Sequence, residues 1–193
     1  MKITKYEHSC IEVKEGNNRL IIDPGIFSKS LNDFSNIDAV VITHEHQDHF
    51  DPVKIQSIIK ANPSVQIITT SQVAKALNSK NAKTARLEEE YSIGKLKLEF
   101  FGEKHELFTD VENIAVLVNN RFYHPGDSYT LPNVPVEVLS APASAPWLRI
   151  TEASKFISDI GPKLHFHRTM HFFPKLANQS TIEYCRVQLK KLA

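Results

Sequence analysis

Cysteine, long apolar runs and an excess of either charge are what this chain of 193 residues lacks. Its two cysteines, Cys10 and Cys185, lie far apart in sequence, so we expect buried thiols rather than a disulfide framework. No apolar run approaches the roughly 20 residues that a transmembrane helix needs. Residues 1–9 do not contain the apolar core of a secretory signal peptide. These absences predict a cytoplasmic protein that does not insert into a membrane.

Basic and acidic residues nearly balance, with 23 Lys and Arg, 22 Asp and Glu, and a formal net charge of +1. A chain with this balance has no overall electrostatic attraction for nucleic acid or anionic lipid. A hydrophobic fraction of 41% with a charged fraction of 23% is ordinary for a globular protein. We find no internal repeat or linker and expect one domain over residues 1–193. The oligomeric state is open, and an oligomer is compatible with the sequence.

One short segment contains a dense cluster of side chains that bind metals. Three histidines and one aspartate fall within six residues: His44, His46, Asp48 and His49. Neutral imidazole and carboxylate groups are a typical ligand set for zinc, iron or manganese. Histidines in a polar loop are often only solvated surface residues, but four potential ligands in one turn favour a metal site.

The cluster is expected on a loop between a strand and a helix. The apolar run at residues 39–42 is typical of a buried strand, and the Asp-Pro pair at residues 51–52 is typical of a helix start. Strand side chains alternate, so the first two histidines of the cluster point the same way. Its aspartate and last histidine follow after the chain has turned. This arrangement suits two neighbouring metal ions rather than one.

Periodicity predicts alternating strands and helices in the first half of the chain. We expect strands at residues 1–6, 10–14, 19–22, 38–43 and 65–69, and helices at residues 51–60 and 71–77. Ser71 is expected to cap the second helix. The alternation implies a partly parallel sheet with right-handed crossovers.

The second half of the chain is richer in strands. We expect strands at residues 95–100, 113–118, 121–124, 136–139 and 163–167, a helix at residues 151–160, and a C-terminal helix from the capping box at residues 180–183. Two β-rich halves that each end in helices predict an α/β protein of the αββα type. Two sheets would pack face to face with helices outside, and the site would lie at one sheet edge.

Two further residues of ligand type follow strand ends in this half: His105 and Asp127. An aspartate in a Pro-Gly-Asp sequence is more often a turn residue than a ligand. Beside a metal cluster that needs partners, however, both residues are the expected suppliers. The two oxygens of an aspartate can also bridge two cations.

These motifs resemble the metallo-β-lactamase-fold superfamily of metal-dependent hydrolases, and most closely its small branch related to the ascorbate-6-phosphate lactonase family. The pattern His-x-His-x-Asp-His is complete at residues 44–49. Further matches, in the same order along the chain, lie at residues 21–25, 102–105, 124–127, 144–148 and 152–153. The resemblance spans nearly the whole chain and implies the four-layer αββα fold of that superfamily.

The resemblance also implies a ligand set for two divalent metal ions. The ligands of the first ion would be His44, His46 and His105. The ligands of the second would be Asp48, His49 and a late histidine, with Asp127 bridging the two ions. Zn2+ is the expected metal, and this ligand set also accepts Mn2+ or Fe2+.

The late histidine is where this chain departs from the branch, which usually ends its last strand in Pro-x-His. Residues 162–171 contain three histidines and no such proline. We predict His167, at the end of the expected strand, as the late ligand and His171 as the second choice. His165 is expected behind the ligands or in the core.

Other residues are expected near the site without holding metal. Those that would orient a ligand or touch substrate are His8, Asp23, His124 and, if His167 is the ligand, His171. A structural role is equally open for His8, and Asp23 could instead be a turn residue. Trp147, the only tryptophan, is expected in the core or at the mouth of the pocket.

The expected chemistry is hydrolysis. Two metal ions about 3.5–4 Å apart can share a bridging hydroxide and lower its pKa towards neutrality, and they stabilise the charge that develops on the attacked oxygen. Asp48 is the expected catalytic residue, which would orient the hydroxide and pass a proton to the leaving group. The resulting prediction is a hydrolase for an ester-like bond in a small molecule: a lactone, a phosphodiester or a phosphorylated metabolite.

Three alternatives stay open. The chain could be a non-catalytic metal-binding protein in which the irregular segment at residues 165–171 has lost the second site. It could be a small nuclease on the same scaffold, although the near-neutral charge and the lack of room for a clamp domain argue against nucleic acid. Redox chemistry at two irons is the third, and the chain has no flavin-binding domain to support it.

Overall fold

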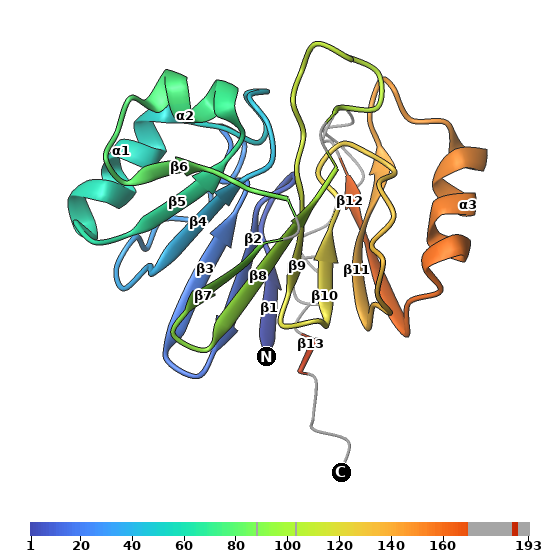
Figure 1. The fold of residues 1–193 in the computed structure, drawn as a ribbon, viewed down its shortest axis with the longest axis horizontal. Coiled ribbons are helices and arrows are strands. Elements are labelled where there is room, and N and C mark those ends of the chain that lie inside the picture. Colours follow the sequence, from blue (N-terminus) through green and yellow to red (C-terminus); the bar gives the residue numbers. More distant parts are fainter. Residues whose placement is uncertain (88, 103, 170–186, 189–193) are drawn as a thin grey trace.

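Two β-sheets lie face to face in the computed structural model, which describes residues 1–87, 89–102, 104–169 and 187–188 (Figure 1). Within these residues one sheet has seven strands and the other has six. Apolar side chains from both sheets fill the space between them, and helices cover the two outer faces. The predicted four-layer αββα sandwich is confirmed.

The first sheet is built from the N-terminal half and one short C-terminal strand. Its strands are β1 (Lys2–Lys5), β2 (Ile11–Glu15), β3 (Asn18–Ile22), β4 (Ala39–Ile42), β5 (Gln66–Thr69), β6 (Ala82–Thr84) and β13 (Val187–Gln188). Their order in space is β13-β1-β2-β3-β4-β5-β6. Strands β3 to β6 are parallel. Helices α1 (Pro52–Ala61) and α2 (Ser71–Leu77) connect β4 to β5 and β5 to β6, as the alternation of elements predicts.

The helix starts follow from local hydrogen bonding. Helix α1 begins at Pro52, and the side chain of Asp51 accepts from two amide groups of its first turn, as predicted. The prediction for α2 is wrong by one residue. Thr70, not Ser71, is the cap: Thr70 has an extended backbone, and its hydroxyl accepts from the amide of Val73 at 3.3 Å.

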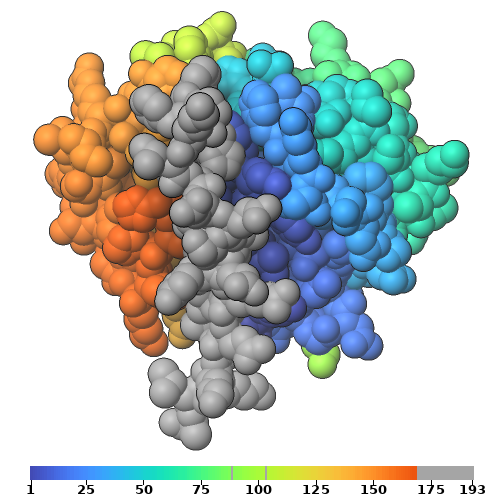
Figure 2. Space-filling view, turned by 180° about the vertical axis from the view of Figure 1, so that it is seen from behind, coloured from blue at the N-terminus to red at the C-terminus, as the bar shows by residue number. Residues whose placement is uncertain are grey.

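The second sheet is built from the C-terminal half. Its strands are β7 (Glu90–Ile93), β8 (Leu96–Phe101), β9 (Ala115–Val118), β10 (Phe122–His124), β11 (Val138–Ser144) and β12 (Leu164–Thr169). They lie in the order β12-β11-β10-β9-β8-β7, and β10, β11 and β12 are parallel. Helix α3 (Ile150–Ile160) covers the outer face through Phe156. Seen from behind, the blue N-terminal residues and the orange residues of this half occupy opposite sides of the molecule (Figure 2).

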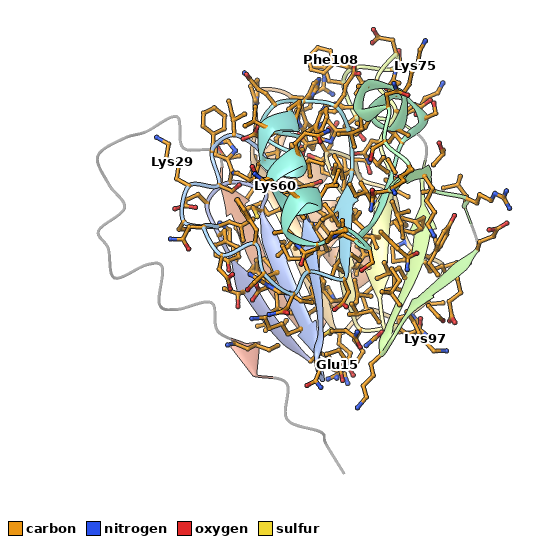
Figure 3. All side chains as sticks on the ribbon, turned by 90° about the vertical axis from the view of Figure 1, so that its left-hand side faces the viewer. Glu15, Lys29, Lys60, Lys75, Lys97 and Phe108 are labelled. Carbon is orange, nitrogen blue, oxygen red and sulfur yellow. The ribbon has the colours of Figure 1, made fainter. Side chains whose placement is uncertain are left out.

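Side-chain alternation builds the core between the sheets. On β8, Leu98 and Phe100 are fully buried between the sheets, whereas Lys97 is exposed. Lys97 and Glu15 lie at one end of the sandwich and Phe108 lies at the other (Figure 3). The strand ends near Phe108 form the edge at which the predicted ligands gather.

Two sequence-based expectations concern the chain as a whole. The predicted C-terminal helix begins at residue 180, which lies outside the described residues. Val187–Gln188, which are described, form the strand β13 beside β1. Among the described helices none is long and apolar enough to cross a membrane.

Leu98→Ala should lower the free energy of unfolding by about 2–5 kcal/mol, because it leaves a cavity between the two sheets. Leu131→Ala is the matched control, since Leu131 is 51% exposed, and it should change stability by no more than about 0.5 kcal/mol. Urea denaturation of the three proteins measures both values. Equal midpoints for Leu98→Ala and wild type would contradict the assignment of the core.

Candidate metal centre

The predicted ligands gather at one edge of the sandwich, just past the ends of strands from both sheets. The loop after β4 contributes His44, His46, Asp48 and His49, and the loops after β8 and β10 contribute His105 and Asp127. Each of these strands runs towards the same edge (Figure 1). Strand ends on a rigid scaffold can hold such side chains in a defined geometry, which a loop alone cannot do.

Three imidazoles form the first group of potential ligands. One ring nitrogen from each of His44, His46 and His105 lies within 4.8 Å of the others. Nε2 of His44 is 3.1 Å from Nδ1 of His46. The amides of Leu107 and Phe108 donate to Nδ1 of His105 at 3.1 and 3.3 Å, which fixes the ring and turns its Nε2 towards the group.

This group fits a divalent metal ion. Nε2 of His105 is buried and has no hydrogen-bond partner among the described residues. Burial, followed by the charge of His49, holds the pKa of His44 well below its usual range, and burial with His105 lowers the pKa of His46. Neutral imidazoles are the form that binds metal, and three protein nitrogens are a common ligand set of a catalytic zinc ion.

Asp23 is a buried hydrogen-bond partner of three residues at the site: Thr43, His49 and His124. It is fully buried at the end of β3, and its Oδ2 lies 2.7 Å from Nδ1 of His49 and 2.9 Å from Nε2 of His124. Its other oxygen accepts from the amide of Thr43 at 2.7 Å. Burial raises the pKa of Asp23, but His49 and His124 outweigh burial and hold the pKa well below its usual range. Asp23 therefore supports the loop of ligands through His49 and the amide of Thr43, and His124 shares the same carboxylate.

His49 is the neighbour of three carboxylates. Besides Asp23, its Nε2 lies 3.4 Å from Oδ1 of Asp127 and 3.5 Å from Oδ2 of Asp48. Burial alone lowers the pKa of His49, but Asp127 and Asp23 outweigh it and raise the pKa well above the usual range. Nε2 of His49 also lies 3.1 Å from Oγ of Ser9.

Asp127 lies between the first group and His49. Its Oδ2 is 3.6 Å from Nε2 of His105, and its Oδ1 faces His49. Trp147, for which the sequence suggested only the core or the pocket mouth, donates its Nε1 hydrogen to Oδ2 of Asp127 at 3.0 Å. This central place is compatible with the expected bridging role of Asp127.

His8 and Gly25 lie beside the loop at residues 43–51, which we call the ligand loop. Nδ1 of His8 lies 3.7 Å from Oδ2 of Asp48, and its ring stacks on Phe27 at a centroid distance of 4.6 Å. A Cβ atom on Gly25 would overlap the backbone of Asp48 and His49. Gly25 therefore allows the end of β3 to pass close to the ligand loop.

The late histidine is not where the sequence predicted it. His167 on β12 is exposed, and its ring packs beside His165, which is also exposed. Arg168 instead points inward and is 4% exposed. Side chains alternate along a strand, so the residue next to His167 takes the inward position. The prediction of His167 as a metal ligand is thus not supported, and His171 lies outside the described residues.

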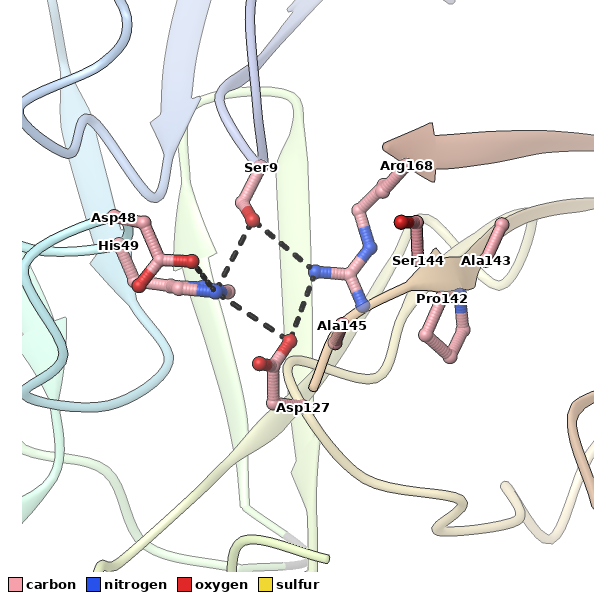
Figure 4. Close-up of a pocket in the computed structure, with 9 residues that line it drawn as sticks. All are labelled: Ser9, Asp48, His49, Asp127, Pro142, Ala143, Ser144, Ala145 and Arg168. Carbon is pink, nitrogen blue, oxygen red and sulfur yellow. Dashed lines mark hydrogen bonds and ion pairs between the residues drawn. The ribbon is translucent and has the colours of Figure 1, made fainter. Parts of the chain in front are cut away.

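Arg168 occupies the place expected of the second ion. Its Nη1 lies 3.5 Å from both Oδ1 of Asp127 and Oγ of Ser9, and its Nη2 donates to the carbonyl of Gly126 (Figure 4). The pocket here has a volume of about 10 Å³, which is about one water molecule. The second group of potential ligands, His44, His49 and Asp127, shares His44 with the first. The described residues thus contain two overlapping groups that could hold a metal ion, and Arg168 brings a positive charge beside the second.

Ser9 and Arg168 are site residues that the sequence analysis did not identify, and it did not foresee the contact of Trp147 with Asp127. Only Arg168 carried a usable signal. Phe166 is the largest apolar residue of β12, and a period of two from an inward Phe166 also turns Arg168 inward. Ser9 and Trp147 reach the site through contacts over 40 and 20 positions of sequence, which no local pattern reveals.

Comparison with known proteins supports the same superfamily. The model of a beta-lactamase superfamily domain matches residues 2–166. Protein Rv0786c of Mycobacterium tuberculosis is 31% identical over 171 residues, which cover 84% of this chain and 80% of that protein. A UPF0173 metal-dependent hydrolase of Natranaerobius thermophilus is 28% identical over 106 residues, which cover 51% of this chain and 46% of the relative. The structure of Igni18, a metallo hydrolase of Ignicoccus hospitalis, matches this chain with a TM-score of 0.73 at 19% identity. The match covers 94% of this chain and 88% of Igni18, and it shows a similar fold.

Asp23→Asn should lower the free energy of unfolding by about 3–5 kcal/mol at pH 7, because it removes the nearest of the three carboxylates around buried His49. The folded-state pKa of Asp23 lies below the unfolded value of about 3.9, so this difference from wild type should shrink as the pH falls below about 4. Urea denaturation at pH 7 and pH 3, in the presence of chelator, measures it. Asp110→Asn removes an exposed carboxylate and should be neutral. A deficit for Asp23→Asn that does not depend on pH would contradict the charge argument.

Proposed function

This chain belongs to the metallo-β-lactamase superfamily, and on that premise we propose that it is a metal-dependent hydrolase whose ion is held by His44, His46 and His105. The observation that carries the proposal is the convergence of three nitrogens within 4.8 Å, of which Nε2 of His105 is buried and has no hydrogen-bond partner among the described residues. Relatives that match part of this chain are named metal-dependent hydrolases, which supports the same activity.

A divalent ion bound there supplies a Lewis acid for the attacked oxygen and lowers the pKa of a water molecule. Residues of the chain then handle the proton. Oδ2 of Asp48 lies within 3.7 Å of the rings of both His49 and His8. Burial raises the pKa of Asp48, but hydrogen bonds from His49 and His8 outweigh burial and keep the carboxylate ionised. Its lowered pKa makes Asp48 a weak base, so its proposed role is to orient the attacking water by accepting a hydrogen bond and to relay a proton to the leaving group.

We propose an ester-like bond in a small molecule as the substrate: a lactone, a phosphodiester or a phosphorylated metabolite. Apolar side chains beside the centre suit a small substrate with an apolar portion. Phe108 is 45% exposed, and its ring centroid lies 5.4 Å from that of His46 and 5.2 Å from that of His105. Phe27, on the other side of the ligand loop, is 41% exposed. A hydroxide shared by two ions is not part of this proposal, because Arg168 lies where the second ion would be held.

A non-catalytic metal-binding protein is the second candidate. The observation that favours it is the same contact of Arg168 with Asp127, since a site that has lost one ion can have lost its activity as well. The two candidates share the metal and differ in turnover, so they are separated by measuring both.

Removal of metal should abolish hydrolysis if the proposal is right. Protein treated with chelator should lose activity on p-nitrophenyl acetate, a simple lactone or bis(p-nitrophenyl) phosphate, and Zn2+ or Mn2+ should restore it. His46→Ala should bind metal more weakly and lose activity, because it removes one of three ligands. His165→Ala, an exposed histidine away from the centre, should match wild type. Stoichiometric metal without turnover on any of these substrates would favour the non-catalytic candidate.

Asp48→Asn should lower kcat by about 10²–10⁴ because an amide cannot take up the proton. Metal content should stay at the wild-type level, since the three imidazoles are untouched. Glu45→Gln changes an exposed carboxylate in the same loop and should leave kcat unchanged. Steady-state kinetics with elemental analysis of each protein checks both expectations, and full activity of Asp48→Asn would remove Asp48 from the proposed chemistry.

A further inference from the structure

We propose that the guanidinium of Arg168 permanently replaces the second metal ion, so that this chain binds one ion rather than two. The inference rests on the metal site proposed at His44, His46 and His105, and it does not depend on hydrolysis. It concerns the pocket lined by Ser9, His49, Asp127 and Arg168 (Figure 4).

Arg168 is held by contacts that a flexible surface arginine would not make. The side chain is 4% exposed, its Nη2 donates to the carbonyl of Gly126, and its Nη1 lies 3.5 Å from Asp127 and from Ser9. Gly126 is itself held in place, because the side chain of Asn113 accepts from the amide of Asp127 at 2.9 Å and donates to the carbonyl of Pro125 at 3.0 Å. The guanidinium is therefore built into the pocket.

The register of β12 keeps Arg168 inward. Phe166 pairs with Ser140 and Arg168 pairs with Pro142 on the neighbouring strand β11. The ring of Phe166 stacks on Phe122 in the core between the sheets, with a centroid distance of 6.1 Å and an interplanar angle of 10°. A shift of one residue that brought His167 inward would turn Phe166 out of this core. The packing of Phe166 thus selects the arginine over the histidine.

The donors left in this pocket share it with a fixed positive charge. Nε2 of His49 lies near carboxylate oxygens of Asp127 and Asp48, so an ion held by these groups would lie beside the guanidinium of Arg168. His44 belongs to the first group, and no histidine of the described part of the chain takes the place of Arg168. A guanidinium cannot lose its proton in a protein and has no lone pair to offer a metal. A second cation next to it would meet repulsion of like charges instead of a ligand.

The guanidinium also supplies the positive charge that a second metal ion would bring to the carboxylates of this pocket. The carboxylates of Asp127 and Asp48 lie 3.4 and 3.5 Å from Nε2 of His49, so two acidic groups share one imidazole. Buried carboxylates require positive partners. Arg168 supplies one that is covalently attached, is always charged and does not exchange with solvent.

The test is metal content per chain by elemental analysis, after saturation with Zn2+ and removal of unbound metal. We expect one equivalent in wild type, one in His167→Ala, and two in Arg168→His, which removes the fixed charge and offers an imidazole from the same inward position. Arg168→Gln, which has no charge and no imidazole, should keep one equivalent, which separates the loss of the charge from the gain of a ligand. If Arg168→His does not fold, the wild-type stoichiometry decides, because two equivalents would overturn the inference. Circular dichroism and urea denaturation establish folding for each.

The outcomes separate this inference from the proposed function. Two equivalents in wild type would overturn the replacement by Arg168 while leaving a metal-dependent hydrolase intact, and loss of one of them in His171→Ala would identify the ligand. One equivalent in wild type and still one in folded Arg168→His would also overturn it, because Arg168 would not be what excludes the second ion. No bound metal in wild type would overturn the proposed metal site itself.

Discussion

The buried carboxylate of Asp23 is the interaction on which the rest of the site depends. At the end of β3 it binds Thr43 and His49 in the ligand loop of its own sheet and His124 on the other sheet. A buried charge is tolerated only when such partners surround it. Asp23 therefore holds these partners close to one another, and through them it links the two sheets at this edge.

The position of Asp23 also determines which charged groups face the pocket. Once Asp23 orients His49, the second nitrogen of the ring faces Asp48 and Asp127, and the pocket contains more carboxylates than one imidazole can balance. Arg168 supplies the additional positive charge. A guanidinium balances charge as a metal ion does, but it does not activate water. The chemistry that we propose therefore uses the three imidazoles of the first group.

Much of the fold and of the first group could be predicted because the signals are local. The apolar run of β4, the helix start after Asp51 and the alternation along β8 each specify an element without reference to distant residues. His105 and Asp127 were expected at the site because both follow strands that end at the same edge. The cap of α2 was misplaced by one residue, since Thr70 and Ser71 are both good caps and only the backbone conformation distinguishes them.

By itself the sequence determined the αββα architecture, the ligand loop at residues 44–49 and the partners His105 and Asp127, because periodicity and ligand spacing act over a few residues. Only the tertiary structure decided which residue of β12 faces the pocket. His167 and Arg168 are neighbours, and strand alternation sends them to opposite faces. The choice between them depends on the pairing of β12 with β11 and on the packing of Phe166 against Phe122, which are contacts between segments distant in sequence.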